Sequence, residues 1–568
     1  MTHSITIQET PQMEKAKSFL EIFYLREQLH PDKTFLRQPA DDHWHAISWK
    51  DAGIQARKVL TVLQDLGLKK GDHVGIISKN CAQWIIADLA ILMGGFVSVP
   101  FYPTLTQDEF QHVIGLSDIK ALFVGKLEFW ENQKQAVPED LPCISFPHYT
   151  GNTKIDCKLQ WHKILEDFAP VENVYMPKRN DIFTVIYTSG TTGTPKGVML
   201  SYECVNQVLK HERQSPKYGI YQGVSERVLS YLPLNHIAER VISEISAVVS
   251  GAEVSFSESL DKFASNLQAV QPTQFFAVPR IWVKIQQGIL AKLPQGKLNL
   301  LLKLPVLSSV IKRKIKHGIG LSEVKSAVSG AAPVSAELLN WFKKLDIHIQ
   351  EVYGATELCG GVTFNEISEI STGTVGKPLP GTEIKIDPET DEVLVKTPWL
   401  MLGYYRSDDK TAEVIQDGFY KTGDTGRFDQ KGNLVITGRI KDTFKTSKGK
   451  FVVPVPLEHH FSANPYIEQV MVTGIGLAQP IALISLNNPL EHSAEDVEAS
   501  LGQTLLEVNS LADSHEQIDK LIIFDPPWSE DSGFFTPTMK LKRHVIDATF
   551  KEKYFQWEKD TRAIIWQR

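Results

Sequence analysis

A stretch rich in glycine and hydroxyl side chains, Tyr187–Ser201, offers the clearest chemistry in this 568-residue sequence. It reads YTSGTTGTPKGVMLS, and an apolar run from Ile182 to Ile186 leads into it. Glycines allow close approach of the backbone, amide and hydroxyl groups donate hydrogen bonds, and Lys196 supplies positive charge, so the composition suits a polyphosphate. The spacing is not that of a Walker A loop, because Lys196 follows a proline and precedes Gly197. A solvated turn between a strand and the next helix is the alternative explanation.

Two later segments place further polar groups where apolar runs end. SYLPLNHIAER, from Ser230 to Arg240, puts His236 after a strand-like run, where a side chain can meet a ligand at the edge of a sheet. Considered alone, a histidine in such a place is more often structural. IQEVYGATE, from Ile349 to Glu357, combines an aromatic ring, which suits a purine, with a carboxylate, which suits a hard cation bridging phosphates.

The elements that must position these groups follow an α/β pattern. Helical periodicity over Trp49–Leu66 alternates with strand-like runs such as His73–Ile77. The segment SAVSGAAPVS, residues 326–335, predicts a buried strand that turns tightly at Gly330 into a helix with Ser335 as its N-cap.

The length of the chain requires more than one domain, because a single hydrophobic core does not serve 568 residues. The composition, 42% hydrophobic and 22% charged, is typical of a globular protein. Towards the carboxy terminus, strand-like runs at Gln469–Thr473 and Leu521–Phe524 lie on either side of an acidic helical segment. This arrangement predicts a small α+β domain at that end.

The complete stretch Tyr187–Ser201 resembles the phosphate-binding signature of the adenylate-forming superfamily, which includes acyl-CoA synthetases, firefly luciferases and the adenylation domains of peptide synthetases. IQEVYGATE and a nearly continuous stretch over Gly403–Val452 resemble the same superfamily, in the same order. PTQFFAVPRIWVKI, from Pro272 to Ile285, resembles the VPR-x-W segment of long-chain acyl-CoA synthetases, although Val283 stands where that pattern usually has glutamate. The resemblance covers nearly all of residues 30–550 and identifies the chain as a long-chain fatty acyl-CoA synthetase.

The resemblance implies a nucleotide site and assigns its residues one by one. Tyr353 is expected to stack on the adenine, Asp424 to accept both ribose hydroxyls, and Glu357 to hold Mg²⁺. The full set implied for ATP and AMP is Thr188, Ser189, Gly190, Thr191, Thr192, Gly193, Lys196, Gly330, Ala331, Ala332, Tyr353, Gly354, Thr356, Asp424 and Arg439.

Catalytic roles are implied for Lys196, His236, Thr356, Glu357 and Lys540. Relatives carry an essential lysine near the carboxy terminus, usually in a Gly-Lys pair. In FTPTMKLKRHVI, residues 535–546, the spacing to Arg543 favours Lys540 over Lys542, and the usual glycine is absent.

The resemblance further implies an α/β fold with a large, multi-subdomain amino-terminal adenylate-forming domain, residues 1–439, and a smaller α+β lid, residues 440–568. Lys441 would be the hinge, and the Gly449 region would face the pantetheine arm of coenzyme A. The expected reaction converts a fatty acid and MgATP to acyl-AMP and pyrophosphate, and coenzyme A then takes the acyl group and releases AMP. One lid would serve both steps.

Two other functions stay open at this point. A fatty acyl-AMP ligase would deliver the adenylate to a carrier protein instead of coenzyme A. A non-catalytic sensor of acyl groups or nucleotides belongs to another class, and it is disfavoured because no catalytic motif is visibly degraded.

Charge and apolar patterning suggest where such an enzyme would work. A net charge of −7 disfavours nucleic acid as a partner. From Lys262 to Ser322 there is no acidic residue but ten lysines or arginines, and the part over Leu298–Leu321 mixes these with leucines. Such a segment can lie on an anionic membrane surface, and a solvated helix packed by its leucines is the alternative.

The remaining signals favour a cytoplasmic protein that attaches to a membrane only at its periphery. Neither a secretory signal nor an apolar run of about 20 residues is visible. The five cysteines lack metal-binding or disulfide-framework spacing, so we expect reduced thiols that serve packing.

Overall fold

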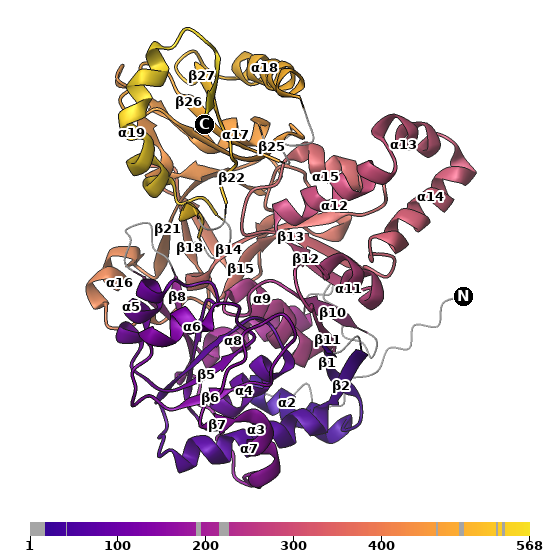
Figure 1. Cartoon of the computed structure of the whole chain (residues 1–568), viewed down its shortest axis with the longest axis vertical. Helices are drawn as coiled ribbons and strands as arrows, with labels where there is room; N and C mark the ends of the chain where they lie inside the picture. The colour runs from indigo at the N-terminus through magenta and orange to yellow at the C-terminus, as the bar shows by residue number, and fades with distance from the viewer. Residues whose placement is uncertain are drawn as a thin grey trace.

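Figure 1 shows a computed structural model, in which a large amino-terminal body carries a smaller carboxy-terminal domain. The structure describes residues 18–40, 43–188, 195–214, 226–461, 464–487, 493–529, 532–536 and 540–568. The mixed α/β class predicted from the sequence is confirmed.

One large sheet of the body has eight strands. Its core is parallel, because β4, β3, β5, β6 and β7 run in the direction of β8, while β9 and β19 pair antiparallel at one edge. In spatial order the strands are β19 (Gly403–Tyr404), β9 (Lys196–Ser201), β8 (Ile182–Thr188), β4 (Val97–Phe101), β3 (His73–Ser78), β5 (Ile119–Gly125), β6 (Cys143–Ser145) and β7 (Leu159–Gln160).

The second large sheet has nine strands, of which the central run from β14 to β1 is parallel. The order is β16 (Lys377–Pro378), β15 (Gly360–Phe364), β14 (Ile349–Ala355), β13 (Ser326–Ser329), β12 (Gln274–Ala277), β10 (Arg227–Ser230), β11 (Glu253–Phe256), β1 (Thr34–Ala40) and β2 (His43–Ser48).

Helices between the two sheets bury their apolar faces against both. Helix α4 (Ala82–Met93) contacts β3 and β4 of one sheet and β1 of the other. It shares one hydrophobic core with α2 (Phe19–Leu29) and α3 (Trp49–Asp65). Burial of this apolar surface from two sides supplies the main stabilisation of the body.

Further helices cover the outer faces of the sheets. On the eight-stranded sheet these include α5 (Gln107–Ser117) and α6 (Trp130–Gln133), and on the nine-stranded sheet α11 (Phe263–Val270), α12 (Pro279–Lys292) and α15 (Ala336–Lys343). Helix α7 (Trp161–Asp167) instead packs against α3 and shares the core of α2, α3 and α4. The remaining helices of the body include α8 (Tyr202–Gln214), α9 (Ile237–Arg240), α10 (Ser246–Ser250) and α16 (Asp408–Val414).

A buried ionic cluster joins α9 to the eight-stranded sheet. The Arg240 guanidinium donates to Thr184 Oγ1 on β8 at 2.7 Å and to Glu244 at 3.0 Å, and it also pairs with Asp88 on α4. All three charged side chains are fully buried. Removing one member of such a cluster leaves an uncompensated charge, so the position of α9 is strongly specified.

The carboxy-terminal domain follows a smaller body sheet formed by β17 (Glu383–Ile386), β18 (Glu392–Lys396), β20 (Ile415–Gln416), β21 (Phe419–Phe428) and β22 (Leu434–Arg439). Its own sheet has the order β25 (Ile467–Thr473), β26 (Ile481–Leu486), β27 (Lys520–Phe524) and β28 (Ile564–Gln567), with a short hairpin of β23 (Phe444–Lys445) and β24 (Phe451–Val452). The helices α17 (Pro454–Phe461), α18 (Ala494–Leu511) and α19 (Arg543–Lys559) complete the predicted α+β domain. The division at residues 439 and 440 stays a prediction.

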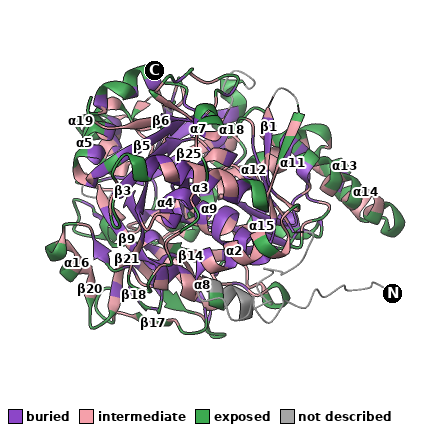
Figure 2. Cartoon of the chain, turned by 90° about the horizontal axis from the view of Figure 1, so that it is seen from below, coloured by how far each residue is buried: buried purple, intermediate pink, exposed green. Residues whose placement is uncertain are grey.

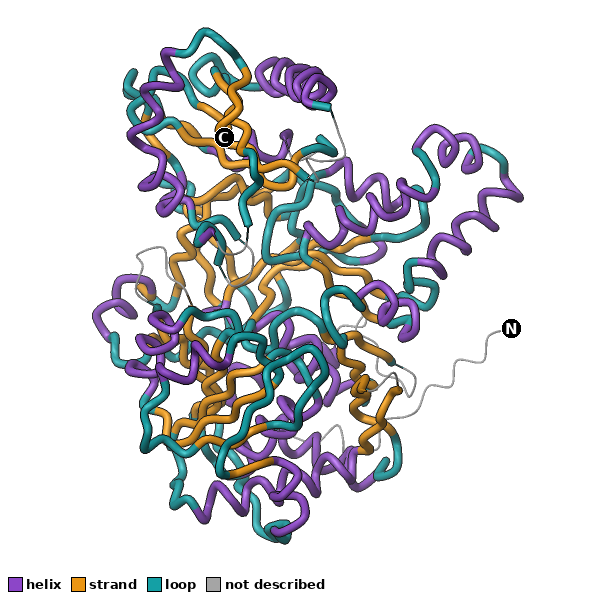
Figure 3. Tube along the Cα trace, in the orientation of Figure 1, coloured by secondary structure: helices purple, strands orange, loops and turns teal. Residues whose placement is uncertain are grey.

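The basic segment forms a helical hairpin that extends away from the body, as Figure 3 shows for the purple helices at the right. It consists of α13 (Gln295–Leu302) and α14 (Pro305–Gly318), and α14 has no buried residue. Figure 2 shows mostly exposed and half-buried residues along both helices.

Local expectations from the sequence agree closely with the structure. The predicted helix over Trp49–Leu66 is α3, the run His73–Ile77 is β3, and the Ser335 hydroxyl caps α15 by accepting from the Leu338 amide at 3.3 Å. The glycine-rich stretch joins two antiparallel strands, β8 and β9, and not a strand and a helix.

Candidate active site

A cavity of about 2820 Å³ lies between the body and the carboxy-terminal domain. Loops at the carboxyl ends of the body strands form much of its wall, the usual place for a ligand in an α/β protein. It is lined by predicted residues from both parts of the chain, namely Thr188, Lys196, His236, Ala331, Ala332, Tyr353, Gly354, Thr356, Glu357, Asp424, Arg439, Lys441 and Lys540.

Two predicted residues lie outside this lining, and five cannot be placed. Gly330 follows β13, and a Cβ atom there would lie 2.6 Å from Val352 Cγ1, so its role is close packing beneath the cavity wall. Gly449 lies in the turn between β23 and β24 with φ at +77°. Ser189, Gly190, Thr191, Thr192 and Gly193 fall outside the described residues.

The two ends of the glycine-rich stretch are fixed by strand pairing. Thr188 ends β8 and lies opposite Lys196, which begins β9. The Lys196 ammonium lies 4.7 Å from the centre of the Tyr404 ring, and the Tyr404 hydroxyl donates to Glu357 Oε1 at 2.9 Å. The Lys196 ammonium and the Glu357 carboxylate therefore both contact Tyr404, and all three residues line the cavity.

Neighbouring positive charges destabilise the protonated form of Lys196. Partial burial lowers the Lys196 pKa below its ordinary value, and the positive charges of Lys410 and Lys441 lower it further. An anion between these ammonium groups would relieve the repulsion.

A second group of polar side chains surrounds Asp424. Its Oδ2 accepts from the Tyr353 hydroxyl at 2.7 Å, and its Oδ1 pairs with Arg439 Nε at 2.7 Å. Asp424 and Arg439 are direct neighbours across the β21–β22 ladder, which explains why a hairpin separates them in the sequence. A carboxylate has about four acceptor positions, so Asp424 can keep these partners and still accept from hydroxyls of a ligand.

The backbone beside Tyr353 leaves no room for a side chain. A Cβ atom on Gly354 would lie 1.8 Å from the Gly360 carbonyl oxygen, so β14 and β15 can approach here only with glycine. Ala331, which follows β13 and also lines the cavity, has a backbone φ of +66°. This left-handed conformation turns the chain sharply after β13 and presents backbone groups to the cavity.

His236 and Lys540 approach each other from the body and the carboxy-terminal domain. His236 is the N-cap of α9, and its Nδ1 accepts from the Ala238 amide at 3.2 Å. Desolvation, with the positive charge of Lys540 as a second cause, lowers the His236 pKa to about 4, so the imidazole is neutral at pH 7.

Lys540 is accessible from the cavity, yet protein surrounds it closely. Desolvation, followed by repulsion from Arg439, lowers its pKa to about 8, while the Asp424 carboxylate acts in the opposite direction. Lys542 instead donates to Glu109 on α5 at 3.3 Å, at the edge of the cavity. Lys540 is thus the lysine near the ribose-binding candidates, in the register that the sequence favours.

Within the described residues, two ion pairs join the body to the carboxy-terminal domain. One is the Lys542–Glu109 pair, and the other joins Arg280 on α12 to Glu468 on β25. Both are partly exposed, so each contributes at most about 1 kcal/mol. These two pairs therefore make only a small contribution to the orientation of the domain.

Glu351 and Tyr404 are site candidates that the sequence analysis did not assign. Glu351 lines the cavity two residues before Tyr353, and its Oε2 has no hydrogen-bond partner within the described part of the chain. Burial raises the Glu351 pKa to about 8, so it is mainly protonated at pH 7. The position of Glu351 within IQEVYGATE could have identified it from the sequence. Tyr404 could not be identified in this way, because its contact is with Glu357, 47 residues away.

Two protein-family models match the chain. The AMP-binding enzyme model covers residues 24–405, and the model of the AMP-binding enzyme C-terminal domain covers residues 441–554. The chain belongs to the AMP-binding enzyme family, the adenylate-forming superfamily that the motifs resemble.

Curated relatives resemble the chain over nearly its whole length. Long-chain-fatty-acid–CoA ligase FadD15 of Mycobacterium bovis is 30% identical, with 92% of this chain and 93% of the relative covered. Long chain acyl-CoA synthetase 3 of Arabidopsis thaliana is 29% identical, with 88% of this chain and 84% of the relative covered.

Solved structures share the fold at lower identity. The adenylation domain of a carboxylate reductase from Mycobacterium chelonae has a TM-score of 0.79 at 20% identity, covering 97% of this chain and 95% of that one. The anthranilate CoA ligase AuaEII, solved with anthranoyl-AMP, has a TM-score of 0.77 at 20% identity, covering 96% of this chain and 99% of that one.

Glu357 provides a direct test of the predicted metal position. Glu357→Gln keeps the shape and the acceptor for Tyr404 but removes the negative charge. If the carboxylate holds Mg²⁺ between phosphates, pyrophosphate release should fall by about 10²-fold or more, most strongly at limiting Mg²⁺. Steady-state pyrophosphate assays across Mg²⁺ concentrations measure this effect, with circular dichroism as the folding control. Near-normal turnover at limiting Mg²⁺ would remove Glu357 from the metal site.

Proposed function

We propose that this chain is a long-chain fatty acid–CoA ligase that forms AMP. The single observation that carries the proposal is the convergence of Lys196, Arg439 and Lys540 on one cavity beside Tyr353 and Asp424. Cationic side chains that can meet phosphates, an aromatic ring that can meet a base and a carboxylate that can accept from hydroxyls together suit a nucleoside triphosphate. The long-chain substrate is supported by the curated relatives, which are named for it.

The first step requires no nucleophile from the protein. The fatty acid carboxylate oxygen attacks the α-phosphorus of ATP, a new P–O bond forms, and the bond to pyrophosphate breaks. Negative charge on the phosphoryl oxygens is stabilised by Lys196 and Lys540, and Thr356 donates a hydrogen bond, so catalysis is positioning together with charge stabilisation.

In the second step the coenzyme A thiol attacks the acyl carbon of the adenylate. The C–S bond forms, the C–O bond to AMP breaks, and the thiol proton is released. Neutral His236 lines the cavity, and because its Nδ1 accepts from the Ala238 amide, its Nε2 carries the hydrogen. It can therefore donate a hydrogen bond to an acyl or phosphate oxygen without adding charge.

Mg²⁺ fits the residues present. Glu357 offers one carboxylate at the cavity edge, and Mg²⁺ in nucleotide sites usually takes one or two carboxylates together with phosphate oxygens. When bound, the ion would neutralise charge on the phosphates. The hydrogen bond from the Tyr404 hydroxyl supports this proposal, because it fixes the orientation of the Glu357 carboxylate.

The orientation of the lid supports the first step. Lys540 lies in the cavity and Lys441 lies at its wall, whereas Gly449 lies outside the cavity-lining residues. We propose that rotation about Lys441 withdraws Lys540 and brings the Gly449 turn towards coenzyme A, so that one lid serves both steps.

Product identification separates the proposal from its alternatives. The protein is incubated with palmitate and MgATP, together with coenzyme A or with a phosphopantetheinyl carrier protein. We expect pyrophosphate, AMP and palmitoyl-CoA, with little acylated carrier. Acyl-carrier as the main thioester would indicate an acyl-AMP ligase, and no pyrophosphate release across fatty acids of increasing length would indicate a sensor.

We further propose that the helical hairpin α13–α14 attaches the enzyme to anionic lipid, where its insoluble substrate resides. Val306 is 84% and Leu300 63% exposed, and the basic side chains of Arg313 and Lys314 are also exposed. Apolar and basic groups on one projecting element suit a membrane surface. Among the described residues, no helix combines the length and the apolar character that a membrane span requires.

Vesicle binding tests the attachment. Each basic side chain at an anionic surface contributes about 1 kcal/mol, so Arg313→Gln/Lys314→Gln should weaken cosedimentation with phosphatidylserine vesicles by about 30-fold. The control Lys158→Gln/Lys163→Gln removes equal charge near α7, at the far end of the molecule in Figure 1, and should have little effect. Equal losses in both double variants, or no binding by the parent protein, would leave the hairpin as ordinary surface.

A further inference from the structure

The segment that carries His236 has no regular secondary structure of its own. Between the end of β10 at Ser230 and the start of α9 at Ile237, residues 231–236 form a loop, here called the His236 loop. Its ends are tied locally, by the Tyr231 amide to Glu239 and by the His236 amide to the Pro233 carbonyl. The middle of the loop therefore depends on contacts with residues outside it.

Asn80 provides that outside contact. Its Nδ2 donates to Ser230 Oγ at 2.8 Å and to the Leu232 carbonyl at 2.6 Å, and its Oδ1 accepts from the Leu234 amide at 3.0 Å. The side chain lies two residues beyond the end of β3 and is 7% exposed. One amide group therefore binds the His236 loop at two points, Leu232 and Leu234, and also binds the end of β10 at Ser230.

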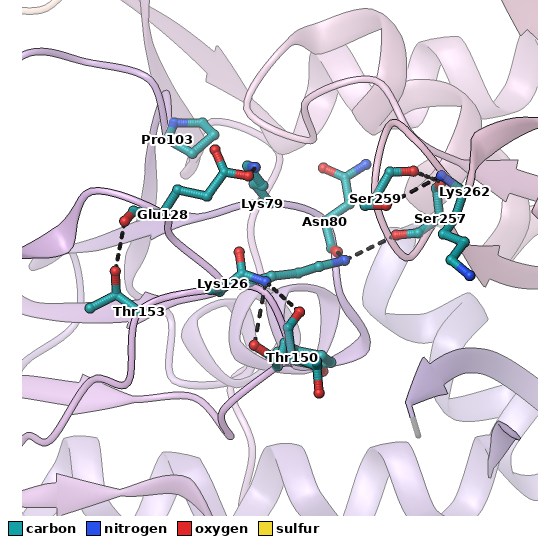
Figure 4. Close-up of polar contacts among 12 residues, drawn as sticks. Lys79, Asn80, Pro103, Lys126, Glu128, Thr150, Thr153, Ser257, Ser259 and Lys262 are labelled. Carbon is teal, nitrogen blue, oxygen red and sulfur yellow. Dashed lines mark hydrogen bonds and ion pairs between the residues drawn. The ribbon is translucent and has the colours of Figure 1, made fainter. Parts of the chain in front are cut away.

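Lys126 holds Asn80 in turn. Its ammonium donates to the Asn80 carbonyl at 2.9 Å and to the Ser257 carbonyl at 3.0 Å, and Figure 4 shows the side chain extended between these residues. Asn80 and Lys126 follow the paired strands β3 and β5 of the eight-stranded sheet, whereas Ser257 follows β11 of the nine-stranded sheet. The lysine thus joins strand ends of both sheets at the cavity wall.

Both the burial and the backbone conformation of Lys126 are energetically unfavourable. It is 5% exposed, and desolvation lowers its pKa to about 8. Its backbone φ of +47° lies in the left-handed region, which is disfavoured for a residue with a side chain. Such local costs concentrate where geometry serves a site.

We propose that Asn80 and Lys126 are positioning residues, which hold the His236 loop so that the imidazole faces the reacting carboxyl and phosphate groups. This inference rests on the proposed function, because it uses the role given there to His236. Neither residue needs to touch a substrate for this purpose.

The position of the imidazole can be measured without any activity. In the parent protein, burial and the charge of Lys540 hold the His236 pKa near 4. If the loop loosens in Asn80→Ala or Lys126→Met, water reaches the ring and its pKa should rise towards the ordinary value of 6.5. Titration of ¹³C-labelled histidines by NMR measures this shift, with the His236 signal identified by its loss in His236→Gln.

Turnover should change in parallel. A displaced catalytic group typically costs about 10²-fold, so pyrophosphate release should fall by that factor in both variants, with the KM for ATP within about twofold of the parent. Lys79→Met is the matched control, because Lys79 is adjacent to Asn80 but its side chain pairs with Glu128 and not with the loop. It should keep both the parent rate and the parent His236 pKa.

A double variant shows whether the effect passes through His236. Asn80→Ala combined with His236→Gln should be no slower than His236→Gln alone, since the loop then has no imidazole to position. Asn80→Asp keeps the acceptor for the Leu234 amide, so its rate of pyrophosphate release should lie between those of the parent and Asn80→Ala. If Asn80→Ala does not fold, Asn80→Asp takes its place in these measurements.

The outcomes separate this inference from the proposed function. A His236 pKa that stays near 4 in both variants, or losses that multiply in the double variant, would overturn the positioning role. Failure of the parent protein to release pyrophosphate would instead refute the proposed function, and the pKa shift would still report whether Asn80 and Lys126 hold the loop.

Discussion

Desolvation of cationic side chains, with repulsion from neighbouring cations as a second cause, is the constraint on which the rest of the site depends. Lys196, Arg439 and Lys540 approach one cavity from two sheets and a separate domain, and the pKa values of both lysines are lowered there. Strand pairing, a buried ionic cluster at Arg240 and packing between the sheets fix the elements that carry these side chains. An anion beside them would compensate for their lost hydration, so the arrangement favours a polyphosphate.

Local motifs made much of this arrangement predictable. The turn after β13 and the β21–β22 pairing of Asp424 with Arg439 each lie within a short stretch of sequence. The α/β class followed from alternating periodicities, whereas the β8–β9 hairpin at Lys196 was not predicted. The choice of Lys540 over Lys542, made from the family motif and the spacing to Arg543, stays a prediction. These features depend on neighbours in the sequence.

Other features depend on partners that are distant in the sequence. Asn80 lies about 150 residues from the loop that it binds, and Tyr404 reaches Lys196 only because β19 pairs with β9. A buried lysine such as Lys126 looks like a surface residue when only the sequence is considered. The exposed leucines of α13–α14 likewise could not be told from packed ones until the hairpin was seen to extend from the body.

The central claim is that Lys540 acts in adenylation while the lid has the orientation seen here, and the two half-reactions measured separately in Lys540→Ala test it most directly. Loss of one charge contact to the reacting phosphate should slow pyrophosphate release from fatty acid and ATP by about 10²–10³-fold. Conversion of synthetic acyl-AMP and coenzyme A to acyl-CoA should stay near the parent rate, because the lid has then turned away. Lys542→Ala, which removes only the partly exposed pair with Glu109, should change either rate by no more than about fivefold. Equal losses in both half-reactions of Lys540→Ala, or a selective loss in Lys542→Ala instead, would contradict the account.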